Sequence, residues 1–122
     1  LLVPLIEENE MDPKLLTIVI QKYLRVIKKK KVDTLILGCT HYPIIKDAIS
    51  KFLGKEVALV NPGEEVALAL KDFLIKKGLD SPKNLHPARE YYVTDLTDRF
   101  ISVSRMFLED NLDGKITKVE IN

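Results

Sequence analysis

The stretch VDTLILGCTHYPII, from Val32 to Ile45, changes from an apolar run to polar residues at a single glycine. Its first part, Val32 to Leu37, is β-branched and short enough for a buried parallel strand, and Gly38 ends it. Pro43 fits the first turn of a helix that continues to Gly54. The stretch therefore predicts a strand and a helix joined by a polar turn.

The alternation of strand and helix continues on both sides of this stretch. Leu1 to Ile6 is a short apolar run, broken by a proline, which favours a strand end or an irregular extended segment. Asp12 to Ile27 has an N-cap, a proline and apolar residues at helical spacing. Val57 to Val60 is a second short strand, and Asn61 to Gly78 has the caps and spacing of a helix. This order predicts an α/β fold, a parallel sheet with helices on both faces.

The segment Leu79 to Arg89 has the turn chemistry of a linker. We therefore expect an α/β domain at 1–80 and a linker with a C-terminal strand-helix segment at 81–122. Within the second part we expect a strand, a helix and a final strand at Glu90–Val93, Asp98–Leu108 and Lys118–Ile121. These elements are too few to bury a core alone, so they must pack on the first domain or on something outside the chain.

The composition is that of a soluble globular domain. The chain has 122 residues, of which 46% are hydrophobic and 30% charged, and its formal net charge is +1. This charge gives no electrostatic reason to expect nucleic acid or an anionic membrane as a partner. The one basic run, Lys28 to Lys31, is expected to be a solvated helix end.

The single cysteine and two histidines limit the kinds of site. One cysteine forms no intrachain disulfide, and these residues are too few for a structural zinc site, so we expect no metal and a reducing, cytoplasmic setting. No apolar stretch reaches the ~20 residues that cross a bilayer. The N-terminus has neither a basic leader nor an initiator methionine, and we expect it to lie in the middle of a longer protein.

Polar residues follow three of the expected strands. They are Glu7 with Glu8, Cys39 with Thr40 and His41, and Asn61 with Gly63. Ligands of open α/β sheets bind beyond the carboxyl ends of the strands, so we expect these groups to meet at one edge. The helix that follows Cys39 offers free backbone N–H groups and a positive dipole end, which favour a thiolate, and His41 can exchange a proton with it.

Each of these residues also has a structural interpretation. Cys39 could be a small buried hydrophobe, Thr40 a simple N-cap and Glu7 a solvated carboxylate. His86, in a proline-containing loop, is expected at the surface. The methionine and phenylalanine positions are expected in the core and carry no functional signal: Met11, Met106, Phe52, Phe73, Phe100 and Phe107.

The motif LGCTHYP resembles the second active-site cysteine motif of the glutamate racemases, in the aspartate/glutamate racemase superfamily. Asp33 to Ile45 matches the family almost residue by residue. Val3 to Glu8 is similar to the family's segment before its long helix, and Tyr91 to Asp110 resembles its C-terminal strand end and helix. His41 favours the glutamate enzymes, because the aspartate enzymes usually carry glutamate there.

The resemblance implies interconversion of L- and D-glutamate by two cysteines on opposite faces of the α-carbon, with no cofactor. Cys39 would be the base that acts on L-glutamate, Thr40 would bind the substrate, and His41 would assist the thiol. Glu7 would be the family's conserved carboxylate, with Glu8 as the alternative. Such an isomerase supplies D-glutamate for peptidoglycan.

The chain departs from the family pattern by lacking the first cysteine and its N-terminal motifs. The resemblance therefore implies the C-terminal half of a two-domain enzyme, with residues 81–122 packing on the N-terminal half that the chain lacks. The sequence NPGEEVA at Asn61 also departs from the family's usual loop. Homodimers are common in the family, but no feature here selects an interface.

We expect the isolated chain to be inactive in racemisation. Two alternatives stay open. One is a related racemase or decarboxylase that acts on aspartate, a hydantoin or an arylmalonate, for which one cysteine can suffice. The other is a truncated, non-catalytic scaffold.

Overall fold

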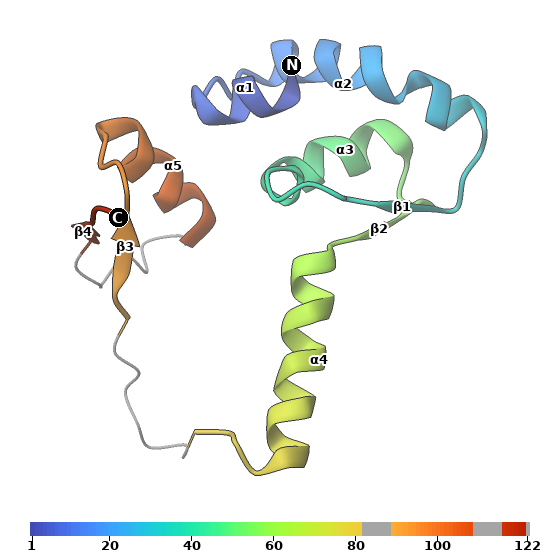
Figure 1. Ribbon diagram of the computed structural model, residues 1–122. Coiled ribbons are helices and arrows are strands. Elements are labelled where there is room, and N and C mark those ends of the chain that lie inside the picture. The colour runs from blue at the N-terminus through green and yellow to red at the C-terminus, as the bar shows by residue number, and fades with distance from the viewer. Residues whose placement is uncertain (82–88, 109–115, 122) are drawn as a thin grey trace. The chain divides into compact units, whose positions relative to one another are not determined.

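The computed structural model describes residues 1–81, 89–108 and 116–121. Figure 1 shows the order of its helices and strands along the chain. The chain divides into two compact units, Leu1–Asp80 and Ser81–Asn122, which we describe separately. His86, expected at the surface, lies outside the described residues.

The N-terminal run is a helix, α1 (Leu2–Glu7), so the prediction of a strand or extended segment there was wrong. Pro4 lies in the first turn of the helix, where backbone N–H groups have no intrahelical acceptor. The missing N–H of the proline therefore destabilises the helix little. Leu2 and Ile6 lie one turn apart and are both buried. Burial of this apolar face decides the conformation.

The helix predicted from Asp12 to Ile27 is confirmed as α2 (Pro13–Lys29). The Asp12 carboxylate accepts hydrogen bonds from the backbone N–H groups of Lys14 at 3.0 Å and Leu15 at 2.8 Å. The cap satisfies two donors that would otherwise have no partner at the helix start. Val19 and Ile20 are among the residues that α2 buries toward the core.

Strands β1 (Thr34–Ile36) and β2 (Ala58–Val60) pair in parallel, with Leu35 opposite Leu59. Parallel pairing was predicted from the alternation of elements and is confirmed. The single helix expected after Pro43 is instead a 3₁₀ turn, η1 (Tyr42–Ile45), followed by α3 (Lys46–Leu53).

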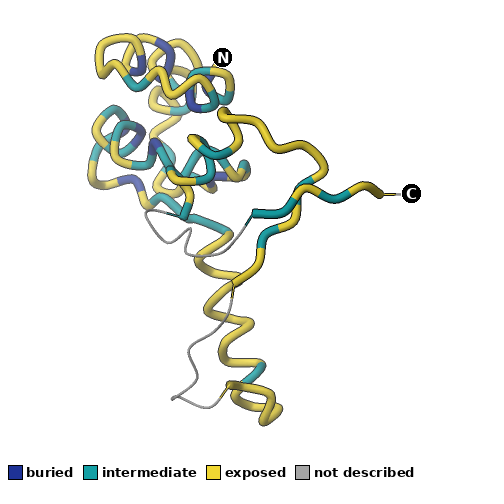
Figure 2. The backbone as a smooth tube through the Cα atoms, turned by 90° about the vertical axis from the view of Figure 1, so that its left-hand side faces the viewer, coloured by how far each residue is buried: buried dark blue, intermediate teal, exposed yellow. Residues whose placement is uncertain are grey.

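The core of the first unit contains ten buried hydrophobic residues, all between Leu2 and Val57 (Figure 2). They come mainly from α1, α2, η1 and α3: Leu2, Ile6, Leu16, Val19, Ile20, Leu37, Ile45, Ile49, Leu53 and Val57. Met11 and Phe52 pack against this cluster while partly exposed.

Helix α4 (Pro62–Lys77) follows β2 and has the boundaries that its capping residues predict. The Asn61 side chain accepts a hydrogen bond from the Gly63 N–H at 3.1 Å. Gly78 ends the helix with a φ of 64°, in the left-handed region that glycine adopts without strain. None of the residues of α4 is buried, and Phe73, expected in the core, is 53% exposed.

The second unit contains β3 (Tyr91–Val93), α5 (Asp98–Leu108) and β4 (Ile116–Lys118), and its two strands pair in parallel. Strand β4 begins two residues before the predicted strand. Phe100 and Phe107 were expected in the core, but both are exposed. The Tyr92 hydroxyl donates to Glu90 at 2.6 Å, and this hydrogen bond to a carboxylate raises the pKa of Tyr92.

Two isoleucines of α2 give a matched test of this core. Ile20 is 0% exposed and Ile18 is 64% exposed. We expect Ile20→Ala to lower the free energy of unfolding by about 2–4 kcal/mol, because it leaves a cavity. Ile18→Ala should change it by less than about 0.5 kcal/mol. Urea denaturation followed by circular dichroism measures both, and equal effects would contradict this description of the core.

Candidate active site

The candidate site begins where β1 ends. After Leu37 the chain leaves the sheet, and the Gly38 N–H donates to the Ile36 carbonyl at 3.0 Å. The Tyr42 N–H then donates to the Cys39 carbonyl at 3.2 Å, which starts the 3₁₀ turn η1. Cys39 is half-buried in the turn between strand and helix.

His41 lies beside both of its polar neighbours in this turn. Its Nδ1 is 3.7 Å from the Cys39 Sγ and 3.4 Å from the Thr40 Oγ1. No side chain caps the start of η1, so Thr40 does not act as an N-cap there. The exposed Thr40 hydroxyl faces the imidazole instead.

Glu7 approaches His41 from the end of α1. Its Oε1 lies 3.2 Å from the His41 Nε2. The two side chains are 40% and 21% exposed, so the pair is only partly screened by water. The structure thereby brings together four of the predicted site residues, which come from α1 and from the turn after β1.

These contacts arrange a carboxylate, an imidazole and a thiol in series. With the proton of the neutral imidazole on Nε2, His41 donates to Glu7 and its Nδ1 lone pair faces Cys39 and Thr40. Transfer of the thiol proton to Nδ1 would give a thiolate and an imidazolium that the Glu7 carboxylate stabilises. The arrangement is therefore suited to generating a nucleophilic or basic sulfur.

The remaining predicted polar residues have other positions. Asn61 follows β2 at the same edge of the sheet as Cys39, and its side chain caps α4. Glu8, the alternative carboxylate, is exposed. Among the residues that the structure describes, no group of three or more His, Cys, Asp or Glu side chains could hold a metal ion. None of the described helices is long and apolar enough to cross a membrane.

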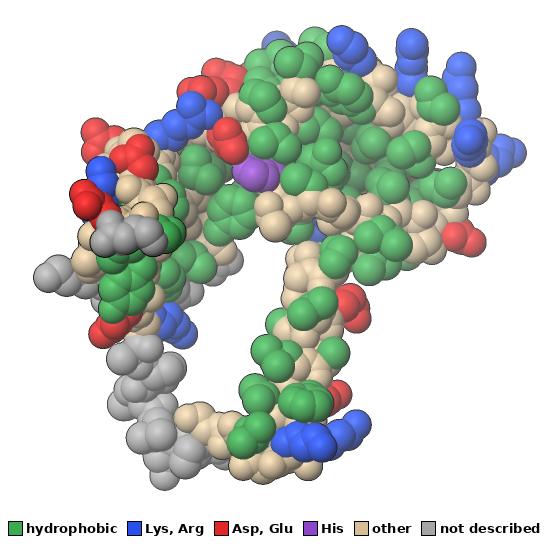
Figure 3. Space-filling view, in the orientation of Figure 1, with side chains coloured by type: hydrophobic (Ala, Val, Ile, Leu, Met, Phe, Trp, Pro, Cys, Tyr) green, Lys and Arg blue, Asp and Glu red, His purple; other side chains and the backbone are tan. Residues whose placement is uncertain are grey.

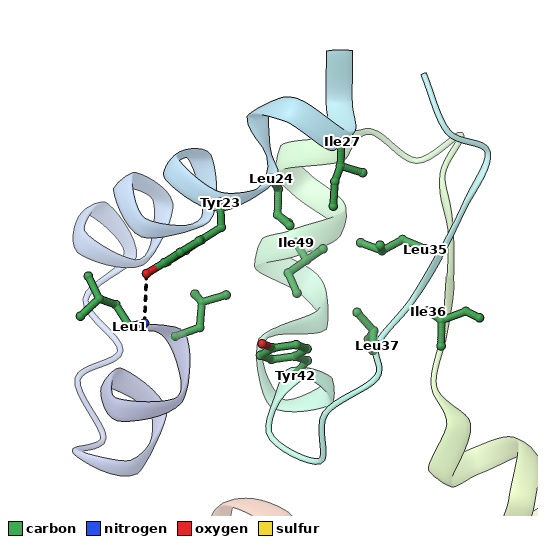
Figure 4. A pocket seen from close by; sticks show the side chains of 10 residues that line it. Leu1, Tyr23, Leu24, Ile27, Leu35, Ile36, Leu37, Tyr42 and Ile49 are labelled. Carbon is green, nitrogen blue, oxygen red and sulfur yellow. Dashed lines mark hydrogen bonds between the residues drawn. The ribbon is translucent and has the colours of Figure 1, made fainter. Parts of the chain in front are cut away.

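An apolar cavity of about 300 Å³ lies apart from these residues, among α1, α2, β1 and α3 (Figure 4). Tyr23, Leu24 and Ile27 line it from α2, and Leu35 and Leu37 from the strand region. The Leu1 amino group donates to the Tyr23 hydroxyl at 3.2 Å across its rim. Sequence reasoning missed this cavity, because its lining has the same apolar spacing as a filled core.

Comparison with known proteins agrees with the sequence motif. No family model matches the chain. The chain is 38% identical over 114 residues to a glutamate racemase of Syntrophus aciditrophicus, covering 93% of this chain and 42% of the relative. It is 36% identical over 121 residues to a glutamate racemase of Geobacter metallireducens. This match covers 99% of this chain and 44% of the relative.

Solved structures give the same result for the fold. The crystal structure of glutamate racemase from Francisella tularensis in complex with D-glutamate matches with a TM-score of 0.85 and 34% identity. The match covers 98% of this chain and 44% of the Francisella tularensis chain. A glutamate racemase from Bacillus anthracis matches with a TM-score of 0.84 and 30% identity.

The predicted resemblance to glutamate racemases, which are isomerases, is thereby confirmed, as is the α/β fold. The chain spans less than half the length of the relatives that it matches, which is consistent with the expected C-terminal half.

The site geometry predicts the reactivity of the one thiol in the chain. We expect His41→Gln to slow alkylation of Cys39 by iodoacetamide at pH 7 by about tenfold or more, because the thiol loses its proton acceptor. Glu7→Gln should slow it by about two- to fivefold. Mass spectrometry of the 122-residue chain measures both rates.

Glu10→Gln is the control, since Glu10 is an exposed carboxylate close to Glu7 in the sequence. Its alkylation rate should stay within about twofold of the parent rate. Equal rates in all four proteins would contradict the series from Glu7 to Cys39.

Proposed function

We propose that this chain carries one of the two acid–base thiols of a glutamate racemase, with Cys39 as the base that acts on L-glutamate. The observation that carries the proposal is the series Glu7–His41–Cys39, with its contacts of 3.2 Å and 3.7 Å. The similarity to glutamate racemases supports the choice of substrate.

The proposed reaction replaces the α-proton of the substrate by a proton from a second thiol. Cys39 gives its proton to His41, and the thiolate then removes the α-proton of L-glutamate, leaving the electron pair on the α-carbon and the substrate carboxylate. A second thiol gives its proton to the opposite face and forms D-glutamate. Afterwards His41 loses to solvent the proton that it took from Cys39, and the second thiolate takes one from solvent, which restores the starting state. In the reverse direction Cys39 is the acid that completes L-glutamate.

The other residues of the turn have supporting roles in this proposal. Thr40 binds the substrate through its backbone N–H and hydroxyl, since that hydroxyl is exposed next to the imidazole. Glu7 holds the His41 ring with Nδ1 directed at the sulfur and stabilises its protonated form. Backbone N–H groups at the start of η1 would stabilise the charge that develops on the substrate carboxylate, and the proposal invokes neither a metal nor pyridoxal phosphate.

The second thiol must come from polypeptide outside this chain, because the chain contains one cysteine. The 122-residue chain by itself is therefore proposed to be inactive in racemisation. Joined to the rest of the enzyme, it would serve the supply of D-glutamate for peptidoglycan in the cytoplasm.

A chimera tests the proposal. The 122 residues replace the matching segment of the Geobacter metallireducens relative, and circular dichroism follows the racemisation of L- and D-glutamate. We expect an active chimera, and we expect Cys39→Ser to lower its kcat/KM by about 10²–10⁴-fold with an unchanged far-UV spectrum, because the hydroxyl is a poor base.

Two results would contradict the proposal. The first is racemisation of glutamate at an enzymatic rate by the isolated 122-residue chain. The second is a folded chimera that acts on aspartate, a hydantoin or an arylmalonate and not on glutamate.

A further inference from the structure

Helix α2 and the two residues that follow it form a strongly basic segment. Residues 13–31 carry seven lysine and arginine side chains and no aspartate or glutamate. The formal net charge of the whole chain is only +1, so positive charge is concentrated in this one element. Figure 3 shows lysine and arginine side chains projecting along the part of the molecule that α2 forms. A local concentration of charge attracts a partner of opposite charge even where the net charge is small.

Four of these cations are spaced by three residues and form what we call the cation row: Lys22, Arg25, Lys28 and Lys31. Residues three apart are neighbours on a helix surface, with about 5–6 Å between them. Lys31 continues the row past the end of α2 with a φ of 51°, in the left-handed region where glycine would be less strained. Within the described ranges 1–81, 89–108 and 116–121, the side chains of Lys22, Arg25 and Lys31 form no ion pair.

Two hollows adjoin the cation row where α2 meets α3. The first, of about 390 Å³, has Lys22 and Arg25 on one side and Ile18 and Phe52 among its other lining residues. Ile18 is 64% exposed and offers an apolar contact there. The second, of about 320 Å³, combines Lys28 and Lys31 with apolar side chains that include Leu53 and Val57. Glu56 is the single carboxylate that lines either hollow. The surface is therefore both basic and partly apolar.

A contact between Lys28 and Phe52 joins the two hollows. The Lys28 Nζ donates to the Phe52 carbonyl and lies 4.7 Å from the centroid of the phenylalanine ring. Lys28 lines the second hollow and Phe52 the first. The contact thus holds α2 and α3 together in the middle of the cation row. A surface that is fixed before a partner arrives loses less conformational entropy on binding.

The exposure of the cation row follows from its chemistry and not from the length of the chain. Lysine and arginine are almost never fully buried unless they are paired. The second hollow also lies at the amino ends of the strands, because Val32 and Val57 line it and precede β1 and β2. Cys39 follows the carboxyl end of β1. Polypeptide that supplies a second thiol there, as proposed above, therefore approaches the opposite end of the strands.

We propose that the cation row and its two hollows bind an acidic segment of a partner protein that also carries an apolar side chain. The carboxylates pair with Lys22, Arg25 and Lys31, and the apolar side chain covers Ile18. The distance from residue 18 to residue 31 is roughly 20 Å, which an extended segment of about six residues spans. Single-stranded nucleic acid fits less well, because its bases need free aromatic faces and one face of the Phe52 ring lies under Lys28.

Fluorescence anisotropy with a labelled peptide tests the proposal. The probe is a peptide of about eight residues that alternates glutamate with leucine, and the control peptide has glutamine in place of each glutamate. We expect the 122-residue chain to bind the acidic peptide at least about tenfold more tightly than the control. Raising the salt concentration from about 0.05 M to about 0.5 M should weaken the binding by about tenfold or more. Equal binding of the two peptides would overturn the proposal.

Two double substitutions remove the same number of positive charges from different helices. Lys22→Gln with Arg25→Gln should weaken binding of the acidic peptide by about tenfold or more, because it removes two cations from the row. Lys71→Gln with Lys76→Gln, in α4, should change it by less than about twofold, since these residues line neither hollow. Ile18→Ala should weaken it by about threefold, through loss of apolar contact. Equal weakening by the two double substitutions would overturn the proposal, as would an unchanged affinity of Ile18→Ala.

Other occupants of the surface give different results. Tighter binding of a single-stranded DNA with the same charge as the peptide would identify nucleic acid as the partner and overturn the proposal. Self-association in sedimentation equilibrium that Lys22→Gln with Arg25→Gln abolishes would identify a second copy and also overturn it. So would peptide binding that is lost in the chimera with the Geobacter metallireducens relative. Racemisation by that chimera tests the proposed function by itself, so either proposal can fail while the other stands.

Discussion

The candidate site depends on the packing of three isoleucines from three different elements. Ile6 and Ile20 are 0% exposed and Ile45 is 2% exposed, and all three belong to the same buried cluster. Ile6 immediately precedes Glu7, and Ile45 ends the turn that His41 begins. Because the side chains of a close-packed core can move little, the burial of these isoleucines sets the distance from the Glu7 carboxylate to the His41 ring.

Local signals in the sequence were sufficient for the longest elements. Asp12 with Pro13 and Asn61 with Pro62 each combine a capping side chain with the fixed φ of proline, so α2 and α4 begin where these residues predict. Neighbours in the sequence also sufficed for three of the four site residues, because Cys39, Thr40 and His41 share one turn. The pairing of His41 with Glu7 depends on tertiary packing. Sequence reasoning placed Glu7 and Glu8 near Cys39 on the expectation of a strand where the structure has α1, and family resemblance favoured Glu7 of the two.

Other features could not be predicted from local patterns. A six-residue apolar run such as Leu1–Ile6 is too short for its period to separate strand from helix, and contacts with α2 and η1 decide in favour of α1. Phe73, Phe100 and Phe107 have the spacing of core residues, but spacing does not say whether their neighbours lie on the same chain. The apolar cavity beside Tyr23 was missed for the same reason.

The position of the core along the chain has a consequence for the order of assembly. In the part of the chain that the structure describes, all ten buried hydrophobic residues lie between Leu2 and Val57, and the contacts that join α1, α2, η1 and α3 fall within this segment. Such contacts close rapidly during folding. During synthesis, Glu7, His41 and Cys39 can therefore meet before the ribosome has released α4.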